Sequence, residues 1–190
     1  MELSGEERIA APRAAVWAAL NDPQVLARCI DGVETLEPDG ENRFKGVLDA
    51  KVGPVRARFQ GTVTLTDIEA PHRYTLIGEG KGGVAGFAKG SADVRLTETD
   101  DGHTVLSWVA KAQVGGRLAQ LGARLVEGAA RGYAEGFFRR FRAIVEAPAA
   151  APAVAEAAPE PAPERGIPAW AWAGALVAGV LAVLLWLLGG

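Results

Sequence analysis

Six residues from Gly78 to Gly83 read GEGKGG, which matches the GxGxxG spacing of dinucleotide-binding loops. In that fingerprint a strand precedes the glycines and a helix follows, so that the pyrophosphate meets the helix N-terminus. Here the motif leads into a second strand-like run, Ser91–Thr97. We therefore interpret it as a glycine-rich hairpin, because glycine readily adopts positive φ angles. The loop of this hairpin either is a mobile segment at the entrance of a cavity or consists of tight turns with no binding role.

Groups that could carry acid–base or metal chemistry are few and scattered. His72 and His103 fall at turns, without a second ligand at metal-binding spacing. The sequence contains no GxSxG, HExxH, paired cysteines or Walker loop. The single cysteine, Cys29, is expected to be a small buried hydrophobe and fits a reducing compartment. We therefore predict no catalytic residue, no metal site and a protein that is not an enzyme.

Apolar and small residues are better candidates for a binding site. Three glycines are spaced four apart within one helical segment, and each costs about 1 kcal/mol relative to alanine. They permit either close approach of the helix to a sheet or space for a ligand. The aromatic residues are either plain core or the wall of a cavity. The candidate cavity residues are Trp17, Phe44, Phe59, Phe87, Trp108, Leu118, Leu121, Leu125, Gly128, Gly132, Tyr133 and Gly136.

Hydrophobic periodicity predicts the elements that must position these residues. A strand ending near Ala11 precedes two short helices, 12–20 and 24–30, the second capped by the run Asn21-Asp22-Pro23. Between Val33 and Val114, period-two runs broken by turn residues predict five or six antiparallel strands. Residues 117–145 form one long helix with a single apolar face, which leaves Phe138 exposed beside arginines. A lone helix across a curved sheet is an α+β two-layer arrangement, and a cavity can form between the layers.

Composition divides the chain into three parts. Residues 1–146 are long enough for one domain, and 147–166 form an Ala/Pro-rich linker. Residues 167–190 carry no charge and have tryptophans near both ends, which predicts a C-terminal transmembrane helix. The expected location is the inner membrane, as a single-pass anchor with a cytoplasmic head. With 20 Lys and Arg against 23 Asp and Glu, no basic patch stands out, which argues against nucleic acid as a partner.

The head domain resembles a known family. The element order is similar to the START-like helix-grip superfamily, also called SRPBCC, whose members hold apolar ligands between sheet and long helix. The segments APRAAVWAALNDPQVLARCIDGVETL, KVGPVRARFQGTVTL and GGRLAQLGARLVEGAARGYAEGFFRRF look like the CoxG family, which takes its name from a subunit of carbon monoxide dehydrogenase. One position departs from the family pattern: Asp31 stands where a proline usually follows Cys-Ile. The expected fold is a helix-grip domain with two short helices, plus a separate transmembrane helix.

The resemblance implies a non-enzymatic accessory of a molybdenum-flavin-iron-sulfur hydroxylase, which it recruits to the membrane. We expect no covalent or metal cofactor. From the placement beside a membrane and the cavity type, we expect a non-covalent lipophilic ligand, either a quinone or a lipid. Two alternatives stay open: a purely structural anchor with a filled core and no ligand, and an enzyme of this fold acting on an apolar substrate.

Overall fold

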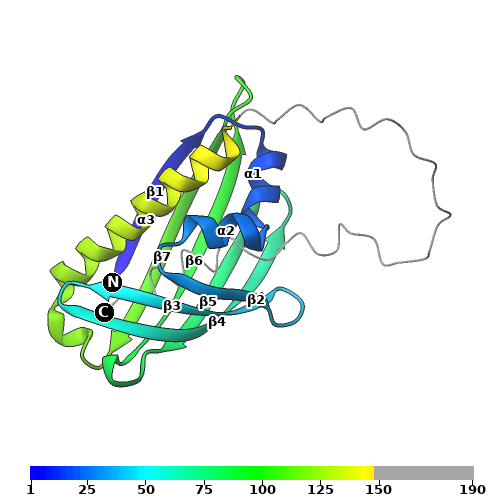
Figure 1. The fold of residues 1–190 in the computed structure, drawn as a ribbon. Coiled ribbons are helices and arrows are strands. Elements are labelled where there is room, and N and C mark those ends of the chain that lie inside the picture. The colour runs from blue at the N-terminus through cyan, green and yellow to red at the C-terminus, as the bar shows by residue number, and fades with distance from the viewer. Residues whose placement is uncertain (148–190) are drawn as a thin grey trace.

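The structure is a computed structural model, which describes residues 1–147 of the 190-residue chain. Strand β1 (Glu2–Ile9) is followed by two short helices, α1 (Arg13–Leu20) and α2 (Pro23–Cys29). Six further strands and a long helix complete the described chain (Figure 1). They are β2 (Val33–Pro38), β3 (Arg43–Val52), β4 (Val55–Glu69), β5 (Arg73–Lys81), β6 (Phe87–Glu98), β7 (Thr104–Gly115) and α3 (Ala123–Val145), with single turns of 3₁₀ helix at η1 (Gly83–Ala85) and η2 (Ala119–Leu121).

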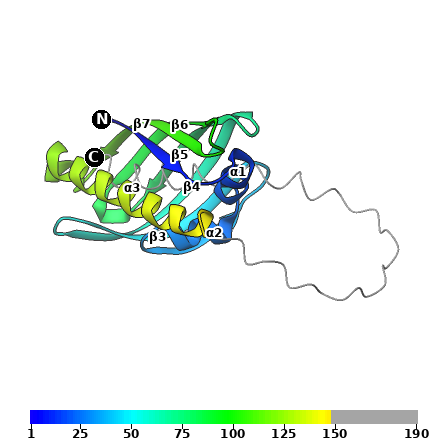
Figure 2. The same ribbon diagram turned by 90° about the horizontal axis from the view of Figure 1, so that it is seen from above.

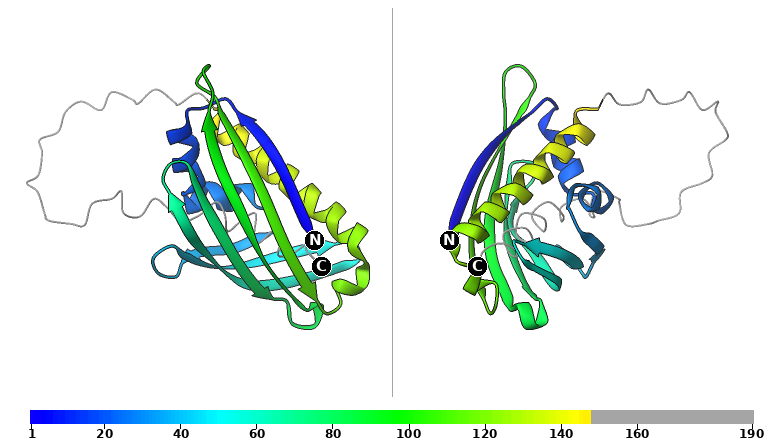
Figure 3. Two further views of the ribbon diagram at one scale, coloured as in Figure 1. Left: turned by 180° about the vertical axis from the view of Figure 1, so that it is seen from behind. Right: turned by 60° about the vertical axis from the view of Figure 1, so that its left-hand side comes forward.

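The seven strands form one antiparallel sheet in the order β1-β7-β6-β5-β4-β3-β2. The sheet curves around α3, which lies across its inner face (Figures 2 and 3). Gly61 lets β4 lie close to β5, because a methyl group added there would lie 2.8 Å from the Glu79 carbonyl oxygen. The strands alternate buried and exposed side chains, so one face of the sheet builds the core and the other faces solvent.

The core lies between the inner face of the sheet and the apolar face of α3. The buried residues of α3 are Val126, Ala130, Ala134, Gly136, Phe137, Phe138 and Phe141. The expectation for Phe138 is wrong: its side chain is only 1% exposed and stacks on Trp108, with ring centroids 6.2 Å apart. Because the sheet curves around α3, side chains well to either side of the helix's apolar stripe are also covered.

Two helix boundaries show how local chemistry sets the elements. The predicted cap of α2 is confirmed, since the Asp22 carboxylate accepts a hydrogen bond from the Gln24 amide at 2.8 Å. The long helix, however, starts at Ala123 and not at Arg117. Gly116 and Gly122 have φ angles of +82° and +84°, which no α-helix accommodates, and only the short turn η2 lies between them.

The predicted transmembrane anchor requires correction. Among the helices of residues 1–147, none is long and apolar enough to cross a membrane. The predicted anchor, 167–190, lies outside the described residues, as does all of the predicted linker except its first residue. The fold that the structure supports is therefore a seven-stranded antiparallel sheet with three helices, consistent with a helix-grip domain. It supports neither the additional membrane helix nor the inner-membrane location inferred from it.

Candidate functional site

The twelve candidate cavity residues fall into three groups. The first is a set of buried aromatic residues: Trp17, Phe44, Phe59 and Trp108. Trp17 meets the Tyr74 ring edge-on at 5.4 Å, and Trp108 stacks on Phe138. In this structure, the Trp17 and Trp108 rings therefore pack against other rings of the core.

Phe44 and Phe59 line a small apolar pocket where strands β2, β3 and β4 meet the end of α2. Its remaining walls include Ile30, Val33 and Leu36, and its volume is about 20 Å³. Roughly 10–15 Å³ of such space is needed for one water molecule. An isoprenoid quinone would therefore have to widen this pocket by displacing its walls.

The second group lies at one end of the molecule. Phe87 opens β6, Leu118 and Leu121 lie in the connection from β7 to α3, and Leu125 is in the first turn of α3. Leu118 is fully buried, and its amide donates to the Ala85 carbonyl at 3.1 Å. Phe87 and Leu125 are 46% and 42% exposed. These candidates lie at loops that connect the strands and α3.

The third group follows α3. Gly128 and Gly132 are exposed, and methyl groups added there would meet nothing within 4 Å. Close approach to the sheet therefore does not explain these two glycines. Gly132, Gly136 and Tyr133 instead line an open groove of about 390 Å³.

Polar and charged groups form the other walls of this groove. They are Asp31, Lys51, Arg139 and Arg140. The Tyr133 hydroxyl accepts a hydrogen bond from the Lys51 amide at 3.2 Å. Arg140 donates to the Cys29 carbonyl at 2.8 Å and pairs with Asp31 at 3.3 Å. The residue that departs from the family pattern therefore has a partner in this chain.

We expect Gly132→Ala to stabilise the protein by about 1 kcal/mol, because the position is exposed, helical and sterically open. Urea denaturation monitored by circular dichroism measures the change. A loss of stability on this substitution would contradict the open environment of Gly132.

The GxGxxG motif is a hairpin, as expected. Gly78 and Gly80 lie in β5, Gly82 and Gly83 fall at the turn η1, and β6 follows directly. Glu79 pairs with Lys89 and Gly80 with Ala88 across the two strands. Because no helix follows the glycines, the phosphate-binding geometry of the dinucleotide fingerprint is missing at this motif.

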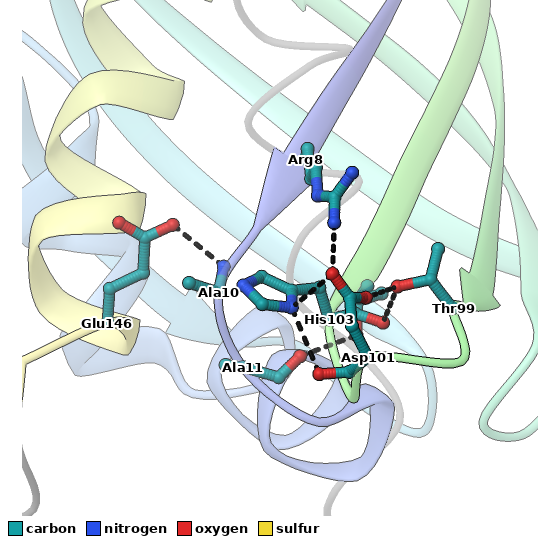
Figure 4. Close-up of polar contacts among 8 residues, drawn as sticks. Arg8, Ala10, Ala11, Thr99, Asp101, His103 and Glu146 are labelled. Carbon is teal, nitrogen blue, oxygen red and sulfur yellow. Dashed lines mark hydrogen bonds and ion pairs between the residues drawn. The ribbon is translucent and has the colours of Figure 1, made fainter.

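The histidines and acidic residues take part in exposed turn contacts. His103 lies 3.1 Å from Asp101, which also pairs with Arg8 (Figure 4). The hydrogen bond from the Thr99 hydroxyl, helped by Arg8 and His103, lowers the pKa of Asp101 to about 2. Nearby, the Glu146 carboxylate accepts from the Ala10 amide at 2.9 Å and ties the end of α3 to the β1–α1 connection. Within residues 1–147, no three His, Cys, Asp or Glu side chains gather as metal ligands would.

Cys29 is fully buried, as expected. Burial raises the pKa of its thiol from 9.0 to about 11, although the positive charges of Arg140 and Arg28 lower this pKa in part. The unfolded thiol loses its proton at a lower pH than the folded one. We therefore expect the free energy of unfolding to fall as pH rises from 9 to 11, by up to about 1.4 kcal/mol per pH unit. Burial also raises the pKa of Tyr74 well above its usual value, which adds to the loss above about pH 10.

Urea unfolding of wild type and Cys29→Ala between pH 7 and 10 measures this dependence. The variant should show the flatter profile between pH 9 and 10, where Tyr74 contributes little. Parallel profiles would mean that the thiol is not protected from ionisation in the folded protein.

Together, the curved antiparallel sheet, the long helix across it and the apolar core define a START-like helix-grip protein. Residues 5–146 match the CoxG family, whose description names it for a subunit of carbon monoxide dehydrogenase, and the chain belongs to that family. Comparison with curated proteins finds no match.

Solved structures show the same fold. A conserved protein from Geobacillus kaustophilus is 30% identical, with a TM-score of 0.73, over 77% of this chain and 95% of that one. A START superfamily protein from Mycobacterium smegmatis is 11% identical, with a TM-score of 0.58, over 76% and 97%. The Zhui aromatase/cyclase from Streptomyces sp. R1128 is 14% identical, with a TM-score of 0.59, over 77% and 93%. At 11% and 14% identity, the last two likenesses concern the fold alone.

Proposed function

We propose that this protein is a non-catalytic accessory that binds a molybdenum-flavin-iron-sulfur hydroxylase of the carbon monoxide dehydrogenase type. The observation that carries the proposal is the family match over residues 5–146, nearly the whole described domain. The distribution of ionisable groups supports a role without catalysis. Asp101 and His103 lie in an exposed turn, and the carboxylates of Glu69 and Glu34 pair with exposed arginines.

The test is direct binding between the full-length chain and a purified hydroxylase of this type. Biolayer interferometry with the hydroxylase immobilised and the accessory in solution should detect saturable binding. A paralogous molybdenum hydroxylase that oxidises a different substrate is the control. Absence of binding to the carbon monoxide dehydrogenase type, under conditions where that enzyme is active, would contradict the proposal.

A second candidate function is binding of a lipophilic molecule, with a quinone as the expected ligand. It is favoured by the apolar lining around Phe44 and Phe59 and by the position of this pocket beside β2, the edge strand of the sheet. Edge strands have one unpaired side, so β2 can move outward with less loss of hydrogen bonds than a central strand. Widening by this movement would turn a pocket of about 20 Å³ into a larger cavity.

Organic extraction of the purified full-length protein, followed by mass spectrometry, tests this candidate. Phe59→Trp should reduce the amount of extracted quinone, because the larger ring fills the pocket. Val109→Trp on the outer face of the sheet is the matched control and should leave the amount unchanged. An extract without quinone or lipid would favour the alternative of a filled core without a ligand.

A further inference from the structure

Three loops that are far apart in the sequence meet at one end of the domain. They are residues 51–56 between β3 and β4, 81–87 between β5 and β6, and 115–125 between β7 and α3, and we call this surface the loop end (Figures 1 and 3). The Leu118 amide donates to the Ala85 carbonyl at 3.1 Å, which joins the second and third loops. The Leu125 side chain packs over Gly53, which joins the third loop to the first.

The loop end carries positive charge without any compensating carboxylate of its own. Its three loops contain five cations, Lys51, Arg56, Lys81, Arg117 and Arg124, and no Asp or Glu. Residues 1–147 as a whole carry 19 Lys and Arg against 20 Asp and Glu, so the charge is segregated. Arg56 pairs with Asp49 at 3.5 Å, whereas the other four cations form no ion pair among the described residues.

The same surface exposes large apolar side chains. Val84 is 84% exposed at the tip of its loop, and Phe87 and Leu125 are about half exposed. Only two other large hydrophobic residues of the described chain are exposed, Ile77 and Val109. Both lie on the outer face of the sheet. An apolar centre with a charged rim is the usual composition of a protein–protein interface.

Backbone contacts hold two loops of the loop end together. Gly86 and Gly116 bring the second and third loops into direct backbone contact, and side chains at either position would overlap the opposite loop. A surface that is held in place before association loses less conformational entropy on binding. The exposed cations around it would speed the approach of an acidic partner.

We propose that the loop end is the surface by which this protein docks on its hydroxylase, and that it recognises an apolar patch ringed by Asp and Glu side chains. This inference rests on the function proposed above and assigns that function to a face of the domain. Val84, Phe87 and Leu125 enter the apolar patch, while Lys81, Arg117 and Arg124 pair with the acidic rim. The α1 and α2 side of the domain stays outside the contact.

Charge reversal at the loop end tests the inference. Lys81→Glu/Arg117→Glu in the full-length protein should weaken hydroxylase binding by at least about tenfold. It should also remove most of the salt dependence of the association rate. Arg28→Glu/Arg95→Glu is the matched control, because these arginines are also exposed, also form no ion pair among the described residues and change the charge equally. Thermal unfolding of each variant confirms that it is folded.

A second pair of variants tests the apolar centre. Val84→Ser should weaken binding about tenfold, whereas Val109→Ser, on the outer face of the sheet, should leave it unchanged. If wild type binds the hydroxylase and the loop-end variants bind equally well, the inference is wrong and the proposed function stands. If wild type does not bind, both are wrong. Loop-dependent binding to phosphatidylglycerol vesicles, with none to the hydroxylase, would overturn the assignment of a protein partner.

Discussion

Replacement of Phe137 by alanine is expected to lower the free energy of unfolding by about 3–5 kcal/mol. The Phe137 ring is fully buried in the middle of the contact between α3 and the sheet. It stacks on Phe141 at 5.6 Å and meets Phe138 edge-on at 5.1 Å. Removing the ring leaves a cavity between α3 and the sheet. The loss of stability therefore affects the whole domain, not a single loop.

Urea denaturation followed by tryptophan fluorescence measures this effect. Phe87→Ala is the matched control, because that ring is nearly half exposed at the loop end, and it should cost less than half as much. Equal losses at the two positions would contradict the central position of α3 in the core.

Replacement of Gly86 by alanine is the second large effect, with an expected loss of about 3 kcal/mol or more. Gly86 has φ +110° and ψ −146°, a backbone conformation that is almost restricted to glycine. An added methyl group would also overlap the Gly115 carbonyl oxygen. The backbone must therefore shift, which separates the loop 81–87 from the loop 115–125.

Hydrogen exchange at the Leu118 amide reports this separation directly, since that amide donates to Ala85 across the two loops. Its protection should fall in Gly86→Ala by more than the change in global stability explains. Gly83→Ala is the control: it also has a positive φ angle, +59°, but a methyl group there meets nothing within 4 Å. It should cost only about 1–2 kcal/mol and leave Leu118 protected.

Element types were predictable because they depend on periodicity along the chain. The period-two runs after Val33 predicted five or six strands, and the structure has six there, β2 to β7. The boundaries were less predictable. The helix expected from Arg117 begins at Ala123, because backbone angles at Gly116 and Gly122 override a continuous apolar pattern.

Burial was harder to predict where it depends on curvature. Phe138 lies off the main apolar stripe of its helix, and its spacing from Phe137 and Phe141 correctly indicates a different direction. Only the curved sheet, which brings Trp108 against it, makes that direction an interior one. Gly128 and Gly132 of α3 show the opposite difference. Their spacing was compatible with packing against the sheet, but in the structure both are exposed.

The loop end was missed for a similar reason. Its cations come from three segments, the first and last about 60 residues apart, and none of these segments is a basic run by itself. A signal was nevertheless present. In an antiparallel meander, alternate connections lie at the same end of the sheet, so β3–β4, β5–β6 and β7–α3 had to converge. That these three connections also lack carboxylates is visible in the sequence.

The sequence by itself determined the kinds of element, their order and the family to which the domain belongs, because these depend on local spacing and on motifs read along the chain. The tertiary structure decided which residues share a surface. It placed Trp17, Phe44, Phe59 and Trp108 in the core but Phe87 at the surface. It also placed Gly132 and Gly136 along an open groove and gathered five cations around exposed apolar side chains. Those groupings depend on how far the sheet curves and on which loops meet, and these are set by contacts between residues distant in the chain.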